Sequence, residues 1–119
     1  MRSAGGSDTL NAFPLFVDER GTLVPIELDA VGFTVRRVFV VTGAAGGSER
    51  GDHVIPCHQQ AVLLAGRAEF RVTTGPDETV SVLERVGQWV ALPAGSYVRY
   101  QLADERSQVL VLAAEAYTP

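Results

Sequence analysis

Short segments rich in apolar and β-branched residues, each ending at a turn, run along most of the chain. The longest spans residues 33–42, where apolar and polar positions alternate before the run becomes wholly apolar. This pattern is typical of a strand that enters a covered core. The other segments predict strands at 12–17, 23–28, 60–64, 68–73, 79–83, 88–92, 97–102 and 108–113.

Turn residues separate the predicted strands, as in the loop 43–47 and at Gly66, Gly87 and Pro93-Ala94-Gly95. No window keeps an apolar period of 3.6 residues for three turns, so we expect almost no helix. Short strands about ten residues apart, joined by such turns, predict an all-β sandwich or barrel.

The length of 119 residues fits one domain. Residues 1–11 are mostly small and polar, and we expect a flexible lead there, followed by a single domain over 12–119. A chain of this size can bury about two thirds of its unfolded surface, which is enough for a core without disulfide support. Cys57 is the single cysteine and cannot form an internal bridge.

The charge pattern argues against several classes of partner. The formal net charge is −4, and the ten basic residues form no run. A nucleic-acid binder needs a concentrated basic surface, so we expect no nucleic-acid partner. No apolar run approaches the ~20 residues of a membrane span, and the N-terminus has no apolar stretch typical of a secretory signal. We therefore expect no membrane contact and a cytoplasmic location.

Two spaced motifs narrow the choice of barrel. Five residues separate Gly47 from His53, and five separate Gly87 from Pro93, which is followed by Ala94 and Gly95. In this order the spacings resemble the two motifs of cupins. The resemblance implies a single small cupin domain, a double-stranded β-helix or jelly-roll barrel. The alternative reading of the second motif is a plain strand between two turns.

Four further motifs lie in the order found in one cupin group, and together they span residues from about 13 to 114. They are Asp18-x-Arg20-Gly21-x-Leu23 with Glu27, Phe33-Thr34-Val35-Arg36-Arg37-Val38, Arg50-Gly51-Asp52-His53 and Cys57-His58-Gln59. On these residues the chain resembles the WxcM-like sugar 3,4-ketoisomerases. The resemblance implies a small-molecule substrate, a 4-keto-6-deoxy sugar linked to thymidine diphosphate (TDP).

The chain also departs from that group. Its pattern reads Arg-Gly-x-His-Ala-His, whereas Ile55 stands here in place of the second histidine. Phe39 replaces the expected tyrosine, and Ser96-Tyr97 replaces a tryptophan. We therefore expect ordinary 3,4-ketoisomerisation to be weak or absent. A changed reaction, such as a cyclisation or epimerisation, stays open.

The chemistry implied by the resemblance needs a base. Moving a ketone from C4 to C3 removes a proton from C3 and returns one at C4, and a histidine titrates in the right range. His53 is the candidate base, and His58 would replace the missing partner if it faced the interior. The alternatives are a core histidine bonded to a carbonyl for His53 and a solvent-facing strand entry for His58. Cys57 is expected to be a small buried apolar group.

Substrate binding is assigned mainly to arginines. Arg50 can fork onto a diphosphate with two hydrogen bonds, or can pair with a neighbouring carboxylate at the surface. Arg20, Arg37 and Arg99 are secondary candidates, with surface ion pairs as the alternative for each. Tyr97, in the second motif, is included among the candidate substrate-binding residues.

A metal is not expected, nor any other cofactor. A cupin metal site takes two histidines and an acid from the first motif region and a histidine from the second. Ile55 and Val98 occupy two of those positions, which leaves His53 alone. A zinc cluster of His53, Cys57 and His58 would lack the usual paired spacing.

Two functional classes remain open. One is a metal-free isomerase-like enzyme acting by proton transfer on a nucleotide-linked keto sugar. The other is a cupin that kept its pocket as a sugar-binding or small-molecule-binding module and lost its catalyst. We also expect a homodimer, because the segment 109–113 is too apolar to be left as an open sheet edge.

Overall fold

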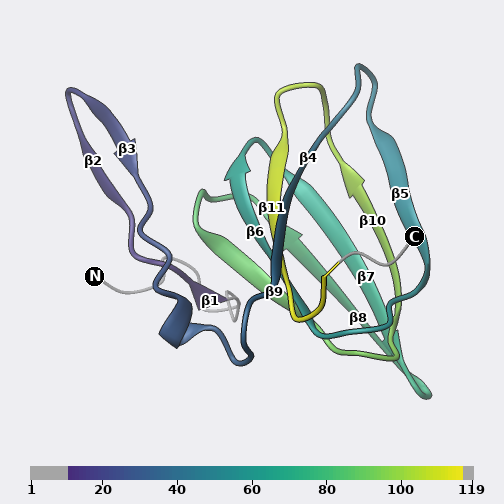
Figure 1. Ribbon diagram of the computed structural model, residues 1–119. Coiled ribbons are helices and arrows are strands. Elements are labelled where there is room, and N and C mark those ends of the chain that lie inside the picture. Colours follow the sequence, from purple (N-terminus) through teal and green to yellow (C-terminus); the bar gives the residue numbers. More distant parts are fainter. Residues whose placement is uncertain (1–10, 117–119) are drawn as a thin grey trace.

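The computed structural model describes residues 11–116 (Figure 1) and consists there of strands and one short 3-10 helix. The strands are β1 (Asn11–Ala12), β2 (Phe16–Asp18), β3 (Gly21–Leu23), β4 (Arg37–Thr42), β5 (Ser48–Val54), β6 (Gln59–Ala65), β7 (Ala68–Thr74), β8 (Asp77–Leu83), β9 (Gln88–Leu92), β10 (Tyr97–Leu102) and β11 (Gln108–Ala113). The 3-10 helix is η1 (Leu28–Ala30). No helix within this range is long and apolar enough to cross a membrane.

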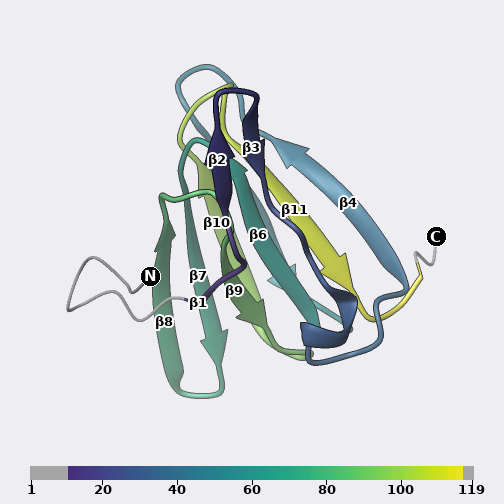
Figure 2. The same ribbon diagram turned by 90° about the vertical axis from the view of Figure 1, so that its left-hand side faces the viewer.

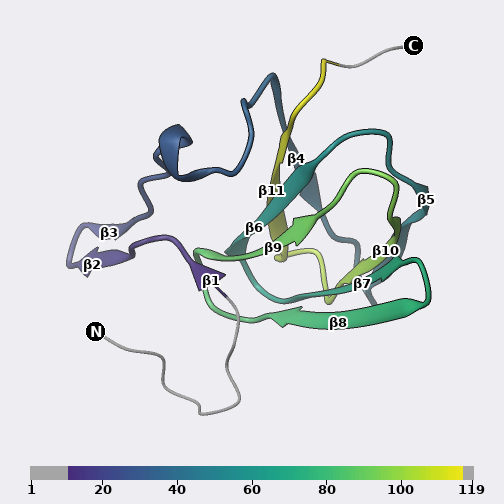
Figure 3. The ribbon, with the colours of Figure 1, turned by 90° about the horizontal axis from the view of Figure 1, so that it is seen from below.

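Two antiparallel sheets face each other (Figure 3). One has the strand order β1-β9-β6-β11-β4 and the other the order β5-β10-β7-β8. Strands β8 and β9 approach each other and join the sheets along one side, whereas β4 and β5 are the free edges of the other side. The all-β prediction is confirmed, and the arrangement is a cupin-type jelly roll that is open between β4 and β5.

The core lies between the two sheets and follows from the two-residue period of the strands. Val109 and Val111 of β11 point inward, together with Ala61 and Leu63 of β6. From the other sheet Phe70, which is fully buried, meets them. Full burial of each large apolar side chain contributes about 1.5–3 kcal/mol, so this layer supplies much of the stability.

A second apolar layer covers the outer face of the five-stranded sheet. Val62 and Leu112, which alternate with the inward residues, lie buried there against Phe13 and Val31. The ring of Phe13 is 6.1 Å from that of Trp89. The segment before β4 therefore packs across the sheet as a cover, so that both faces of β6 are buried.

This cover explains where the strand predictions were wrong. The predicted strand 12–17 is divided by Pro14, which has no N–H to donate, and only part of it is paired. Residues 24–28 form no strand, and the strand predicted over 33–42 begins at Arg37. Phe33 and Val35 pack on the outer layer instead, so their alternation reflects contact with the sheet and not pairing within it.

The domain boundary at residue 12 stays a prediction. The flexible lead expected over 1–11 lies outside the described residues except at its last position. There Asn11 pairs with Trp89 in the five-stranded sheet. The paired region therefore begins one residue before the predicted domain.

The hairpin formed by β2 and β3 stands away from both sheets (Figure 1) and lies in front of the five-stranded sheet in Figure 2. It carries exposed apolar side chains, with Phe16 58%, Val17 68% and Leu23 63% accessible. On the edge strand β4, Val38 and Val40 are also exposed. The apolar segment 109–113 is different: β11 lies between β6 and β4, so our reason for expecting a dimer from it was wrong.

Candidate functional site

The candidate site lies on the open side of the barrel, on the interior faces of the edge strands β4 and β5. His53 of β5 is directly opposite Val98 of β10, whose side chain is in the core. Residues opposite each other in an antiparallel pair share a face, so His53 is on the interior side. Its side chain is nevertheless exposed, because β5 is an edge strand.

Arg50 faces the same way. It is opposite Tyr100, which packs against the core and stacks on Phe70 with ring centroids 4.7 Å apart. Arg50 and His53 are three residues apart, a spacing that puts side chains on opposite faces of a regular strand. A register shift against Val98 and Arg99 removes this conflict and brings both residues to the interior face.

Strand β4 adds a further cation. Arg37 and Phe39 are opposite the buried Ala113 and Val111 of β11, so both belong to the interior face. The guanidinium carbon of Arg37 lies 4.6 Å from the centre of the Phe39 ring. Phe39, in the position where a tyrosine was expected, therefore supplies a surface for a cation and no hydroxyl.

His58 is on the other side of the five-stranded sheet. Its ring is 6.3 Å from that of Phe33 in the outer layer, and its Nδ1 accepts a hydrogen bond of 3.1 Å from the N–H of Ala94. The structure thus does not bring His58 to His53, and gives no support to a shared role. Cys57 is a free, buried cysteine, as expected for a small apolar group.

Two of the predicted arginines lie away from the interior. Arg20 is at the tip of the β2–β3 hairpin, where it forms an ion pair of 2.6 Å with Asp18. This contact raises the pKa of Arg20 and lowers the pKa of Asp18. Arg99 alternates with the core residue Val98, so it faces outward, and it is directly opposite Arg71.

Tyr97 also faces outward. Its hydroxyl donates a short hydrogen bond to Oδ1 of Asp52 on the neighbouring strand. This bond is the main cause that raises the pKa of Tyr97. The structure therefore places Arg50 and His53 on the interior face of β5 and Arg37 on the interior face of β4. It leaves the other predicted residues, namely Arg20, His58, Tyr97 and Arg99, outside the barrel.

The residues of the first motif do not fit a metal. Within residues 11–116 no group of three histidine, cysteine, aspartate or glutamate side chains could hold an ion. Ile55, at the missing ligand position, is 3% accessible and part of the core, and Val98 fills the place of the last ligand. Independence of metal stays a prediction.

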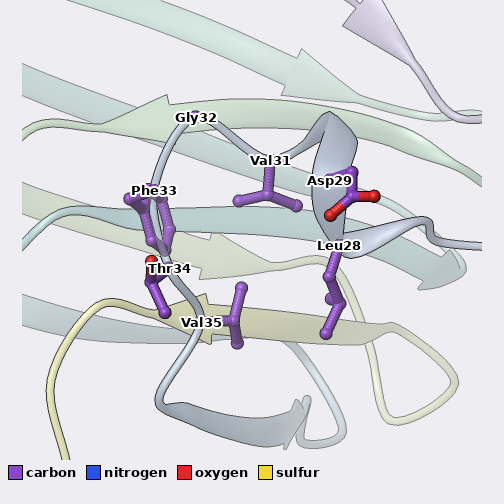
Figure 4. Close-up of a pocket in the computed structure, with 7 residues that line it drawn as sticks. All are labelled: Leu28, Asp29, Val31, Gly32, Phe33, Thr34 and Val35. Carbon is purple, nitrogen blue, oxygen red and sulfur yellow. The ribbon is translucent and has the colours of Figure 1, made fainter.

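A separate pocket of about 430 Å³ lies outside the barrel (Figure 4). Its lining comes entirely from η1 and the loop between η1 and β4, and consists of Leu28, Asp29, Val31, Gly32, Phe33, Thr34 and Val35. Sequence reasoning missed it because residues 33–35 were interpreted as the start of a strand. The hollow is formed by one loop and does not include His53, Arg50 or Arg37.

Comparison with known proteins bears on the family. The family model described as "FdtA: WxcM-like, C-terminal" matches residues 7–119. No curated protein is a match to the sequence.

Several solved structures are similar to this chain in fold. The chain is similar to QdtA, a sugar 3,4-ketoisomerase from Thermoanaerobacterium thermosaccharolyticum in complex with TDP, with 27% identity and a TM-score of 0.79 over 92% of this chain and 81% of that one. A 3,4-ketoisomerase from Helicobacter canadensis gives 21% identity, a TM-score of 0.80 and coverage of 92% and 84%. The chain is also similar in structure to the 3'-monoepimerase ChmJ from Streptomyces bikiniensis, in complex with dTDP-quinovose. The identity is 18% and the TM-score 0.77, over 92% of this chain and 65% of that one.

Proposed function

Because the chain belongs to the WxcM-like, C-terminal (FdtA) family, we propose that it binds a TDP-linked keto sugar on the open side of the barrel and transfers a proton on it. The observation that carries the proposal is the shared interior face of His53 and Arg50, with Arg37 on the facing edge strand. Structures with the same fold include sugar ketoisomerases and an epimerase, so the proposed class is an isomerase-like enzyme.

The proposed step is the removal of a proton from the carbon next to the ketone. His53 takes that proton, and the electron pair of the C–H bond forms an enediolate across the two carbons. A proton returned to the neighbouring carbon completes an isomerisation when the hydroxyl on the first carbon also gives up its proton and the former ketone oxygen gains one. A proton returned to the same carbon on its other face gives an epimer. The guanidinium groups of Arg37 and Arg50 supply positive charge for the diphosphate and for the developing enediolate.

The absence of a second acid and base in the first motif favours a limited reaction. Ile55 is buried in the core and cannot transfer a proton, and Phe39 has no hydroxyl. A single general acid or base supplies about 10²- to 10⁴-fold in rate, so we expect weak ordinary 3,4-ketoisomerisation. The same observation supports the second candidate function, a binding module that retains its pocket and has no turnover.

Titration of the purified protein with TDP, followed by the TDP-linked 4-keto-6-deoxy sugar in D2O, separates these functions. Binding with deuterium exchange at C3 supports the enzyme, and binding without exchange supports the binding module. No saturable binding of TDP contradicts both. Treatment with a chelator should change neither result, because Ile55 and Val98 occupy two of the positions that hold metal ligands in cupins.

We also propose a homodimer, for a reason different from the one the sequence suggested. Each chain carries an apolar hairpin that stands away from its own sheets and an edge strand with exposed Val38 and Val40. A second copy of the chain carries the matching part for each, so that a hairpin can cover β4 of its partner. If each hairpin covers β4 of the other copy, Arg20 lies closer to the barrel of the other copy than to its own.

Light scattering after size exclusion tests the dimer. We expect a dimer at micromolar concentration, and a monomer for Phe16→Asp, which places a charge on the hairpin. Val80→Asp is the matched control, because Val80 is similarly exposed but lies on β8. A monomeric wild-type protein contradicts the proposal.

The cytoplasmic location also stays a prediction, one that fits a nucleotide-linked substrate.

A further inference from the structure

The direction of His53 depends on an irregularity in β5. Along β10, Tyr100 is paired with Arg50 and Val98 with His53, but Arg99 is paired with Gly51. Two residues of β10 therefore span three of β5, and Asp52 is the extra residue. A bulge of this kind turns the following side chains to the other face, which is how His53 reaches the interior.

The backbone of this bulge is in a conformation that most residues avoid. Gly51 has φ +81° and Asp52 has φ +63°, and Asp52 is the single non-glycine residue with positive φ among residues 11–116. A Cβ on Gly51 would lie 2.8 Å from the carbonyl oxygen of Val98. Aspartate tolerates the left-handed region better than most side chains, but such a position persists only when its surroundings hold it.

One side-chain hydrogen bond joins the bulge to the neighbouring strand. Tyr97, opposite Val54, faces outward, and its hydroxyl donates to the Asp52 carboxylate. The carboxylate of the extra residue is thus fixed on the outer face, immediately before His53. Both side chains therefore face away from the interior of the barrel.

We propose that Asp52 and Tyr97 are positioning residues, which hold the bulge and thereby keep His53 directed into the barrel beside Arg50. With the pair broken, β5 can return to regular pairing, and His53 then moves to the outer face. The effect on the direction of His53 is independent of the reaction. Its effect on turnover rests on the proposed function.

NMR of the His53 ring in the full-length protein tests the direction. The reference is a nuclear Overhauser contact between the ring protons of His53 and the methyl groups of Val98 in the wild type. Tyr97→Phe removes the donor alone, and we expect this contact to weaken or disappear. Asp52→Asn keeps an acceptor oxygen and should retain the contact. Thr73→Val is the matched control, because Thr73 is outward and opposite Tyr97 but takes no part in the pair.

A second variant protects the test against simple unfolding. Asp52→Ala removes the carboxylate and disfavours positive φ, so β5 should return to regular pairing, and the barrel should stay folded because Asp52 is exposed. An unchanged His53–Val98 contact in folded Tyr97→Phe and folded Asp52→Ala overturns the proposal. Neither result requires a substrate, so a wild-type protein without turnover counts against the proposed function alone.

Where turnover is measurable, the same variants give a second readout. A base that is no longer directed at its carbon lowers kcat, and we expect a loss of about tenfold to a hundredfold with KM nearly unchanged. Asp52→Asn should recover most of the rate. A raised KM with an unchanged kcat would mean that the pair acts on binding and would overturn the positioning role.

Discussion

Strand β11 is bonded on both sides, to β6 and β4, and four of its six residues are buried, whereas β5 is bonded only to β10 and none of its seven residues is buried. The first strand is almost wholly apolar and the second carries Arg50, Asp52 and His53. An edge strand that contributes no buried residue to the core can depart from regular pairing at little cost to the stability of the fold. This freedom allows two polar side chains three residues apart to face the same interior.

The largest expected effect is the loss of turnover on substitution of His53 in β5. His53→Gln keeps a hydrogen-bonding side chain but cannot take up a proton at neutral pH, so turnover should fall by about 10²- to 10⁴-fold. The melting temperature should change little, because the wild-type side chain is exposed. Steady-state kinetics and a thermal melt measure the two effects.

His58→Gln is the matched control for this prediction, since His58 is the other histidine and lies on the outer layer. It should retain the wild-type rate. Full activity in folded His53→Gln would contradict the role of base, and a large loss in the control would show that the outer histidine matters.

The core should show the opposite behaviour. Phe70 is fully buried and stacks on Tyr100, so Phe70→Ala should cost about 3–5 kcal/mol in the free energy of unfolding. Urea unfolding measures this loss. Val80→Ala, on an exposed position of the neighbouring β8, should stay within about 0.5 kcal/mol. A similar loss in the two variants would contradict the assignment of the core.

A smaller effect is expected at Gly51, where β5 lies against β10. Gly51→Ala introduces a Cβ that lies 2.8 Å from the Val98 carbonyl oxygen, in addition to a strained positive φ. We expect a loss of about 1–3 kcal/mol in chemical unfolding. Gly75→Ala is the control, because Gly75 also has positive φ but has open space around its Cβ position. An equal loss of unfolding free energy in both variants would show that the contact with the Val98 carbonyl oxygen does not contribute to the effect.

The smallest effect concerns the hairpin, far from either strand. The pKa of Asp18 is lowered by its hydrogen bonds to the side chain and backbone of Arg20. The stabilisation is therefore present above the unfolded-state pKa, near 3.8, and is lost as the pH falls through the lower pKa of the folded state. The amide signal of Arg20 should move in that acidic range, and Asp18→Asn should abolish the movement. A movement that persists in the variant would assign it to another group.

Sequence reasoning was most successful for strands in which one face is buried in the core and the other is not. The predicted strands at 88–92, 97–102 and 108–113 agree with the structure, because there the pattern directly records which face is buried. It failed for residues 33–36, whose alternation arises from packing across a sheet. An apolar period of two does not distinguish these two causes.

The sequence predicted which residues belong to the candidate site but not the direction in which their side chains point. The motif identified His53 and Arg50, but their shared face depends on the bulge at Asp52, which a period of two does not contain. The outward direction of His58 depends on Phe33, a residue 25 positions away along the chain. The contact between Tyr97 and Asp52 is likewise long-range, and neither residue alone signals it.

The place of β11 in its sheet has a consequence for how the protein is made. This strand follows all the others along the described chain, yet it lies between β6 and β4, and β4 has no other neighbour in the sheet. A growing chain on the ribosome therefore cannot attach β4 until residues 108–113 have emerged. Until then β4 presents its apolar residues to other molecules, and the long separation of the paired strands makes closure slow. Assembly of this sheet is thus delayed until the last of the described strands has been synthesised.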